Sequence, residues 1–392
     1  MIDEPRATVV KLTPDGRGAV AVLLVEGGEA AELVGRHFFG HSPEPLGSRP
    51  LNRILHGHWG SCGGEDVVVC RRSATEVEIQ CHGGSAAAER IVADLAANGC
   101  ALMDWREWIG SRESSRIRAD ARALLANVRT ERTAAILLDQ YLGALDAALA
   151  RIDGYLEADD ANAAQTGLQA LVAHSSVGLH LVEPWRVAIA GPPNVGKSSL
   201  INALVGYRRS IVFDQPGTTR DVVTVATAID GWPIELSDTA GLRASDDALE
   251  SAGVELARRQ LAAADCVVLI FDVTERWTDE CESLIQDYPA AIVVLNKVDL
   301  LPDTEPARGQ FGGCGAPPLL TSAVTNCGID DLAATLVRRV VSHEPQPGDA
   351  VPFTPLQVEQ VRAALDAVSR GDLSAARIQI QNAAGRVSRA KR

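Results

Sequence analysis

The stretch Arg186–Ser199, RVAIAGPPNVGKSS, decides the fold of this chain. Residues 186–190 are typical of a buried strand, and the pattern G-x-x-x-x-G-K-S then runs from Gly191 to Ser198. A helical run, SLINALVG, follows directly. Strand, glycine-rich loop and helix in this order predict a P-loop.

The P-loop predicts how a phosphate chain is held. Pro192 and Pro193 have no N–H, so the backbone donors must come from residues 194–198. Lys197 supplies a cation for the outer phosphate oxygens, and the Ser198 hydroxyl suits magnesium. The nucleotide-binding residues expected here are Gly191, Asn194, Val195, Gly196, Lys197, Ser198 and Ser199.

Composition limits the other possibilities. The 392 residues predict two or three domains, and a net charge of -14 argues against a wholly electrostatic nucleic-acid binder. Eight scattered cysteines without a C-x-x-C pair predict neither a disulfide framework nor a zinc knuckle. His56 and His58 lie near Cys62, but a short loop without a fourth ligand is more typical of polar surface. With neither a signal pattern nor a membrane-spanning run in the sequence, we expect a cytoplasmic protein that does not enter a membrane.

The order of predicted elements gives the fold class. Residues 1–107 are rich in strands, with two strands around a turn within 8–26, further strands over 66–70 and 76–80, and a helix over 86–97. Residues 108–183 are helical, and residues 344–392 hold a Pro-rich linker and terminal helices. Residues 184–343 alternate between the two element types. Strands are expected near 186–190, 222–229, 232–238, 267–272, 291–296 and 319–321, and helices at 198–205, 248–263, 278–287 and 329–342. We therefore expect an α/β P-loop domain with a doubly wound, mostly parallel sheet, inserted in a helical domain and preceded by a small α+β domain.

Two further motifs follow the P-loop. Either threonine of the segment 216–221, PGTTRD, can give magnesium a second hydroxyl from a loop that senses the γ-phosphate, although a plain turn explains this segment equally well. In D-T-A-G, the Asp238 carboxylate faces magnesium and the Gly241 N–H faces the γ-phosphate.

The next two motifs identify the base. Asp299 of the N-K-V-D motif can accept both guanine donors, N1–H and N2–H, and leaves adenine without a matching edge. Asn296 orients this loop and the Lys297 stem packs over the base. Ser322 and Ala323, in the segment T-S-A, support the base with a backbone N–H. Five motifs in this order, each at a strand end, predict a GTP-binding domain.

The catalytic group is less obvious. In Ras the residue after D-x-x-G is a glutamine that orients the attacking water, whereas this chain has Leu242, which cannot polarise water. The candidates to orient the attacking water are the carboxylates of Asp246, Asp247 and Glu250. A cation held near the phosphates by Asn194 is the candidate to replace an arginine finger.

At this point the sequence resembles a family. GPPNVGKSSLINAL, IVFDQPGTTRD, DTAGLR and NKVD are similar to the G domain of the tRNA-modification GTPases MnmE, also called TrmE. TVVKLTPDGRGAVAVLLVEG, VEIQCHGG and ERTAAILLDQYLGAL resemble the family's N-terminal and helical segments. The family's C-terminal Cys-x-Gly-Lys has no counterpart, since no cysteine follows Cys327, so this chain resembles a shortened homologue.

The resemblance implies a catalytic apparatus. Asn194 and Thr218 would bind a potassium ion that acts in place of an arginine finger, with carbonyls near Phe213 and Gln215. Thr219 would be the magnesium threonine beside Ser198 and Asp238. Glu250, twelve residues after that aspartate, would position water through a bridging water. The catalytic set is then Glu250, Asn194, Lys197 and Thr219.

The resemblance also implies partners. G domains would pair when GTP and potassium bind. The N-terminal domains would hold a homodimer and bind formyl-tetrahydrofolate. An MnmG-type flavoprotein and tRNA would be the partners in wobble-uridine modification. The PGEF and GED segments of the family are replaced here, by Met103–Trp108 and Ala74–Glu76. The alternative is a regulatory or ribosome-assembly GTPase switch without tRNA-modifying activity.

Overall fold

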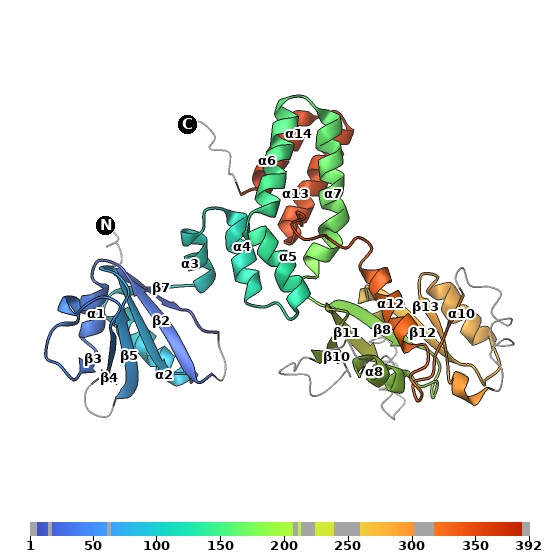
Figure 1. The fold of residues 1–392 in the computed structure, drawn as a ribbon, viewed down its shortest axis with the longest axis horizontal. Helices are drawn as coiled ribbons and strands as arrows, with labels where there is room; N and C mark the ends of the chain where they lie inside the picture. Colours follow the sequence, from blue (N-terminus) through green and yellow to red (C-terminus); the bar gives the residue numbers. More distant parts are fainter. Residues whose placement is uncertain are drawn as a thin grey trace. The chain divides into compact units, whose positions relative to one another are not determined.

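The computed structural model describes residues 6–14, 18–60, 64–206, 211–212, 224–238, 259–301 and 317–385. The chain divides into two compact units, Met1–Ser114 and Ser115–Arg392. Both are drawn in Figure 1, and each is described by itself.

The first unit is built on a seven-stranded sheet with the strand order β3-β4-β5-β6-β2-β1-β7. Neighbouring strands are antiparallel except β1 and β7, which are parallel. Alternation of side chains gives the sheet one apolar face, which packs against α1 and α2. The strands are β1 (Ala7–Lys11), β2 (Val20–Glu26), β3 (Phe38–Gly40), β4 (Ile54–Trp59), β5 (Glu65–Arg71), β6 (Glu76–His82) and β7 (Cys100–Met103). The helices are α1 (Ala30–Gly35), α2 (Ser85–Ala97) and α3 (Trp105–Arg112).

Helix α3 closes this unit. Asp104 caps it by accepting a hydrogen bond from the Arg106 N–H at 2.8 Å. The Trp108 indole then donates to Glu26 on β2 at 3.1 Å, and Arg112 forms an ion pair with the same carboxylate at 2.9 Å. Polar contacts therefore fix α3 to the sheet.

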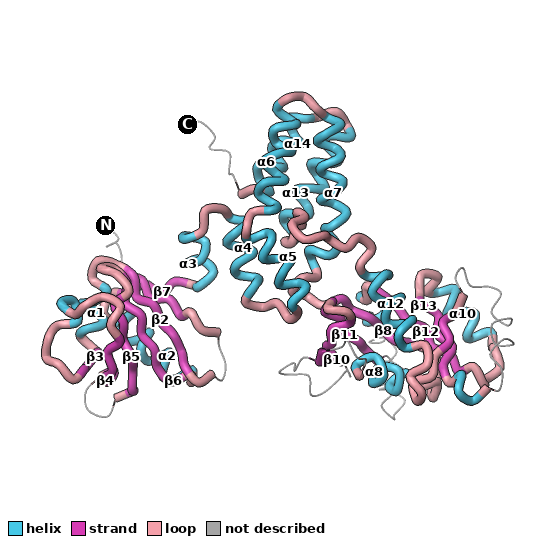
Figure 2. Tube along the Cα trace, in the orientation of Figure 1, coloured by secondary structure: helices cyan, strands magenta, loops and turns pink. Residues whose placement is uncertain are grey.

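The second unit begins with helices α4 (Arg116–Leu125), α5 (Glu131–Tyr141), α6 (Ala144–Glu157) and α7 (Ala161–Leu179). Two helices from the end of the chain, α13 (Pro355–Ser369) and α14 (Leu373–Ala383), pack against α7 and α6. The tube in Figure 2 follows these four helices side by side. The buried Gln140 amide joins both segments, because it donates to the Asp349 carbonyl at 2.9 Å and accepts from the Val351 N–H at 3.1 Å.

The part of the chain between these two helical segments forms a second seven-stranded sheet, with the order β14-β13-β12-β8-β11-β10-β9. Its first five strands are parallel, and β10 and β9 continue it in antiparallel fashion. The strands are β8 (Trp185–Ala190), β9 (Ile211–Val212), β10 (Thr224–Ile229), β11 (Trp232–Asp238), β12 (Cys266–Asp272), β13 (Ile292–Asn296) and β14 (Leu319–Leu320). The helices are α8 (Lys197–Val205), α10 (Asp279–Asp287), α12 (Ile329–Val340) and the short 3-10 helix η3 (Val298–Leu300).

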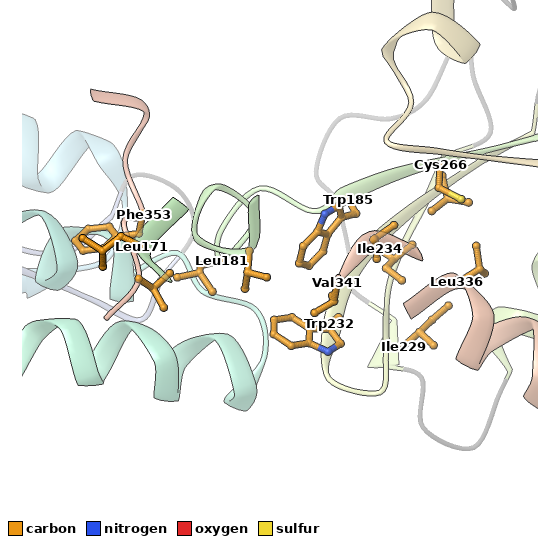
Figure 3. Packing of buried hydrophobic residues seen from close by; sticks show 14 of the residues in the cluster. Leu171, Leu181, Trp185, Ile229, Trp232, Ile234, Cys266, Leu336, Val341 and Phe353 are labelled. Atoms are coloured by element: carbon orange, nitrogen blue, oxygen red, sulfur yellow. The ribbon is translucent and has the colours of Figure 1, made fainter. Parts of the chain in front are cut away.

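Aromatic residues join the helices to this sheet. Trp185 is buried at the start of β8, stacks on His180 with ring centroids 4.6 Å apart and meets Trp232 edge-on at 5.6 Å. Figure 3 shows both indoles beside Leu181 from the helical side and Val341 from the sheet side. The helical segment and the sheet therefore share one apolar core.

Strongly patterned elements match the sequence-based expectations. The strands expected at 186–190, 232–238, 267–272 and 291–296 and the helix at 198–205 are confirmed. Most of the helix expected over 248–263 lies outside the described residues. The sequence missed β3, β4, β7 and α1, which are short or interrupted by glycine and histidine. The expectation that His56 and His58 lie in a loop is wrong, because both are part of β4.

Candidate functional site

The carboxyl ends of parallel strands meet at one edge of the second sheet. The P-loop follows β8, Asp238 ends β11, Asn296 ends β13 and Thr321 directly follows β14. Because ligands of open α/β sheets bind at this edge, the topology alone brings the predicted motifs together.

The P-loop depends on two glycines. Gly191 has φ 148° and lies so close to β12 that a Cβ would be 2.1 Å from the Ile270 carbonyl oxygen. Gly196 has φ 95°, and a Cβ there would be 2.5 Å from Nδ2 of Asn296. A side chain at either position would displace the loop, which explains in steric terms why the motif has glycine at both positions.

Lys197 lies at the start of α8 and is only 5% exposed. Its ammonium donates to the carbonyl oxygens of Gly191 at 2.9 Å and Pro192 at 2.6 Å. The buried cation is thereby held inside the loop, next to the N-terminus of a helix, where an anion is stabilised.

Ser198 and Asp238 meet at the other end of the loop. The Ser198 hydroxyl donates to Oδ2 of the buried Asp238 at 2.6 Å. A hydroxyl and a carboxylate side by side offer the hard oxygen ligands that Mg²⁺ prefers. The residues present therefore fit a magnesium ion, which would supply Lewis-acid charge at the phosphates.

Asn296 is the centre of a buried hydrogen-bond network. Its side-chain N–H donates to the Val195 carbonyl of the P-loop at 2.9 Å. Its side-chain oxygen accepts from the Thr321 hydroxyl at 3.2 Å and from the Ala323 N–H at 3.3 Å. One side chain that is 2% exposed thus ties the ends of β8, β13 and β14 together.

Lys297 makes a second connection to the P-loop. With φ 69°, it points its ammonium to the Asn194 carbonyl at 2.8 Å and to Oδ2 of Asp272 at 2.6 Å. Burial opposes ionisation of Asp272, but hydrogen bonds from Lys297 and Thr274 together with the Lys297 charge lower its pKa. Sequence reasoning did not select Asp272, although its position at the end of β12 was the available signal.

The other residues predicted to recognise the base are Asp299, Ser322 and Ala323. Asp299 is exposed on η3, directly after the buried Val298. Ser322 is fully buried, its N–H donates to the Cys327 carbonyl at 2.9 Å, and its hydroxyl accepts from the Thr325 N–H at 3.1 Å. The loop after β14 is therefore closed on itself beside Ala323.

Several predicted site residues lie outside the described residues, so their positions are not part of this geometry. They are Phe213, Gln215, Thr218, Thr219, Gly241 and Glu250.

Comparisons with known proteins show which proteins this chain is similar to. A family model described as "50S ribosome-binding GTPase" matches residues 186–297. The tRNA modification GTPase MnmE of Geobacillus thermodenitrificans is 32% identical over 382 residues, covering 86% of this chain and 82% of the relative. The MnmE of Bacillus subtilis is 31% identical, covering 82% of this chain and 79% of the relative.

The chain belongs to the MnmE family. It is therefore a GTPase, and both the nucleotide and Mg²⁺ are implied by this membership. Among solved structures, Era of Aquifex aeolicus is 30% identical with a TM-score of 0.33, covering 46% of this chain and 66% of that chain. No helix in the described part of this MnmE-family chain is long and apolar enough to cross a membrane.

Proposed function

We propose that this chain hydrolyses GTP to GDP and phosphate at the edge of the second sheet, in a reaction stimulated by potassium and linked to tRNA wobble-uridine modification. Residues 184–343 form the G domain in this proposal. Residues 1–107 form the N-terminal domain, and residues 108–183 and 344–392 are the two parts of the helical domain.

One observation carries the nucleotide site. Asn296 and Lys297 of the base-recognition motif donate directly to the Val195 and Asn194 carbonyls of the P-loop, at 2.9 and 2.8 Å. Phosphate and base recognition are thus parts of one hydrogen-bonded unit. In it, Asp299 accepts the guanine donors and Lys197 neutralises the outer phosphate oxygens.

Asn194 is the residue on which activation would depend. Its φ of 64° is unusual for a side chain other than glycine, and its side chain is exposed at the rim of the loop. In the proposal its side-chain oxygen binds potassium together with Thr218 and carbonyls near Phe213 and Gln215. Ser198, Thr219 and Asp238 hold magnesium, Gly241 contacts the γ-phosphate and Glu250 positions the attacking water.

The wider pathway rests on the family. The relative named tRNA modification GTPase MnmE covers 86% of this chain, which is more than the second unit alone, so the match extends into the first unit. We extend the proposal to a homodimer whose G domains pair when GTP binds, to formyl-tetrahydrofolate in the N-terminal domain, and to an MnmG-type flavoprotein and tRNA as partners.

The test compares GTP turnover in potassium and sodium at equal ionic strength. We expect faster turnover in potassium, and we expect Glu250→Ala to bind GTP normally while losing hydrolysis. Glu282→Ala, an exposed carboxylate on α10, is the matched control and should keep both properties. Equal turnover in both salts would remove the potassium assignment.

A second candidate is a regulatory or ribosome-assembly switch without tRNA-modifying activity. The description of the matching family model, a 50S ribosome-binding GTPase, favours it. Wobble-uridine modification in tRNA from a strain lacking this gene separates the two. Unmodified uridine supports the tRNA role, and unchanged tRNA together with abnormal ribosome profiles supports the switch.

A further inference from the structure

The first unit carries a cluster of histidines on the face of its sheet that lies away from α1 and α2. His56 and His58 are two residues apart on β4, and Asp66 on β5 lies directly opposite His58. Side chains alternate along a strand, and the neighbours Trp59 and Val67 belong to the apolar core. The two imidazoles and the carboxylate therefore share the other, outer face.

A third histidine directly follows the adjacent strand, β3. Gly40, the last residue of β3, pairs with Gly57, so His41 directly follows this pair and lies beside His56. The ring centroids of these two histidines are 5.8 Å apart, and those of His56 and His58 are 6.0 Å apart. Two neighbouring strands, β4 and β5, and the residue after β3 thus contribute to one polar cluster.

The carboxylate lies between two of the imidazoles. Oδ1 of Asp66 is 2.8 Å from Nδ1 of His58 and 3.9 Å from Nε2 of His56. All three side chains are more than half exposed, at 56%, 54% and 56% for Asp66, His58 and His56 respectively. An ion in solution can therefore reach them directly.

We propose that His41, His56, His58 and Asp66 form a binding site for one divalent transition-metal ion of the zinc type. Ligand atoms about 2.0–2.1 Å from a tetrahedral ion lie about 3.3 Å from one another. The observed nitrogen–oxygen distances of 2.8 and 3.9 Å lie on either side of that value. Imidazole with one carboxylate suits zinc, nickel or copper, whereas magnesium prefers oxygen ligands alone.

Binding requires a small rearrangement. As the side chains lie, no group of three or more His, Cys, Asp or Glu residues in the described parts of the chain is arranged so that it could hold a metal ion. Nδ1 of His58 and Oδ1 of Asp66 are only 2.8 Å apart, so these two atoms must separate slightly when both bind one ion. Exposed side chains change rotamer within nanoseconds, so the four groups can converge on an ion without moving the strands.

The test uses the full chain after treatment with a chelator, with reduced thiols. Isothermal titration with Zn²⁺ should show one ion per chain. The double variant His56→Gln/His58→Gln should weaken this binding by at least about tenfold, because even substitutions behind the ligands cost about 10–100-fold. Co²⁺ should give visible absorption bands without the near-ultraviolet band of thiolate ligation.

His343→Gln is the matched control, because this exposed histidine lies after α12 and outside the cluster. It should bind zinc as the unaltered chain does. Equal affinity of the double variant and the unaltered chain would overturn the proposal, as would a thiolate band or no saturable binding. Asp66→Asn, which keeps the size of the side chain, should weaken binding while leaving the thermal unfolding of the metal-free chain unchanged.

Discussion

Asp272→Asn tests the connection between base recognition and the P-loop. The carboxylate accepts from the Lys297 ammonium at 2.6 Å and, through its other oxygen, from the N–H and hydroxyl of Thr274 at 2.9 and 2.7 Å. An asparagine that keeps both Thr274 contacts turns its NH₂ group towards the ammonium. The substitution therefore replaces an attractive contact by two facing donors.

The expected magnitude follows from that contact. A hydrogen bond between charged groups contributes about 1.5–3 kcal/mol. Lys297 is 32% exposed, so water recovers part of the loss and we expect the lower end, about 1.5 kcal/mol, in the free energy of unfolding. Because the same ammonium donates to the Asn194 carbonyl, GDP affinity should fall by about tenfold, the equivalent of 1.4 kcal/mol.

Urea denaturation and the dissociation rate of a fluorescent GDP analogue measure the two effects. Asp287→Asn, at the exposed end of α10, is the control and should change neither. The reasoning is refuted if Asp272→Asn unfolds within about 0.3 kcal/mol of the unaltered chain and releases GDP at the same rate.

The stability that the ion pair between Asp272 and Lys297 contributes should depend on pH. The pKa of Asp272 is lowered from its ordinary value of 3.8, with burial opposing the shift and Lys297 and Thr274 causing it. A lowered pKa gives stability that is present above the ordinary value and is lost as pH falls towards the folded value. The difference in unfolding free energy between the unaltered chain and Asp272→Asn should therefore be full at pH 7 and shrink below pH 3.8.

Three further outcomes are expected. Gly196→Ala should lower GDP affinity by about tenfold or more in a fluorescence titration. The left-handed backbone at this position and a Cβ 2.5 Å from Nδ2 of Asn296 together cost about 1–3 kcal/mol. Unchanged affinity would contradict this expectation. Thr321→Val should lower the urea unfolding free energy by about 0.5–1.5 kcal/mol through loss of the hydroxyl bond to Asn296, and no change would mean that the bond contributes nothing. Burial raises the pKa of the Cys266 thiol to about 11, so alkylation of the folded chain at pH 8, followed by mass spectrometry, should modify the exposed Cys327 and spare Cys266.

The first unit shows where sequence reasoning reaches its limit. β1, β2 and β5 contain apolar runs, β6 alternates between apolar and polar residues, and all four were predicted. In contrast, β4 reads ILHGHW and carries glycine and histidine. It is a strand because β3 and β5 pair with it on both sides. Tertiary pairing thus overrides weak local propensity in this part of the sheet.

The sequence by itself determined the nucleotide motifs, their order and the guanine preference. It could do so because phosphate binding uses consecutive backbone groups and one adjacent lysine, so the chemistry of the P-loop is contained in a few neighbouring residues. The C-terminal end of each strand then placed Asp238 and Asn296 at the ligand edge without further information.

Only the tertiary structure decided which distant groups meet. Asp272 forms an ion pair with Lys297, and Asp66 lies opposite His58. Both contacts depend on the register in which the neighbouring strands pair. A shift of one residue would turn each of these side chains to the opposite face. Register is set by the packing of a whole sheet on its helices, and short sequence patterns do not contain that information.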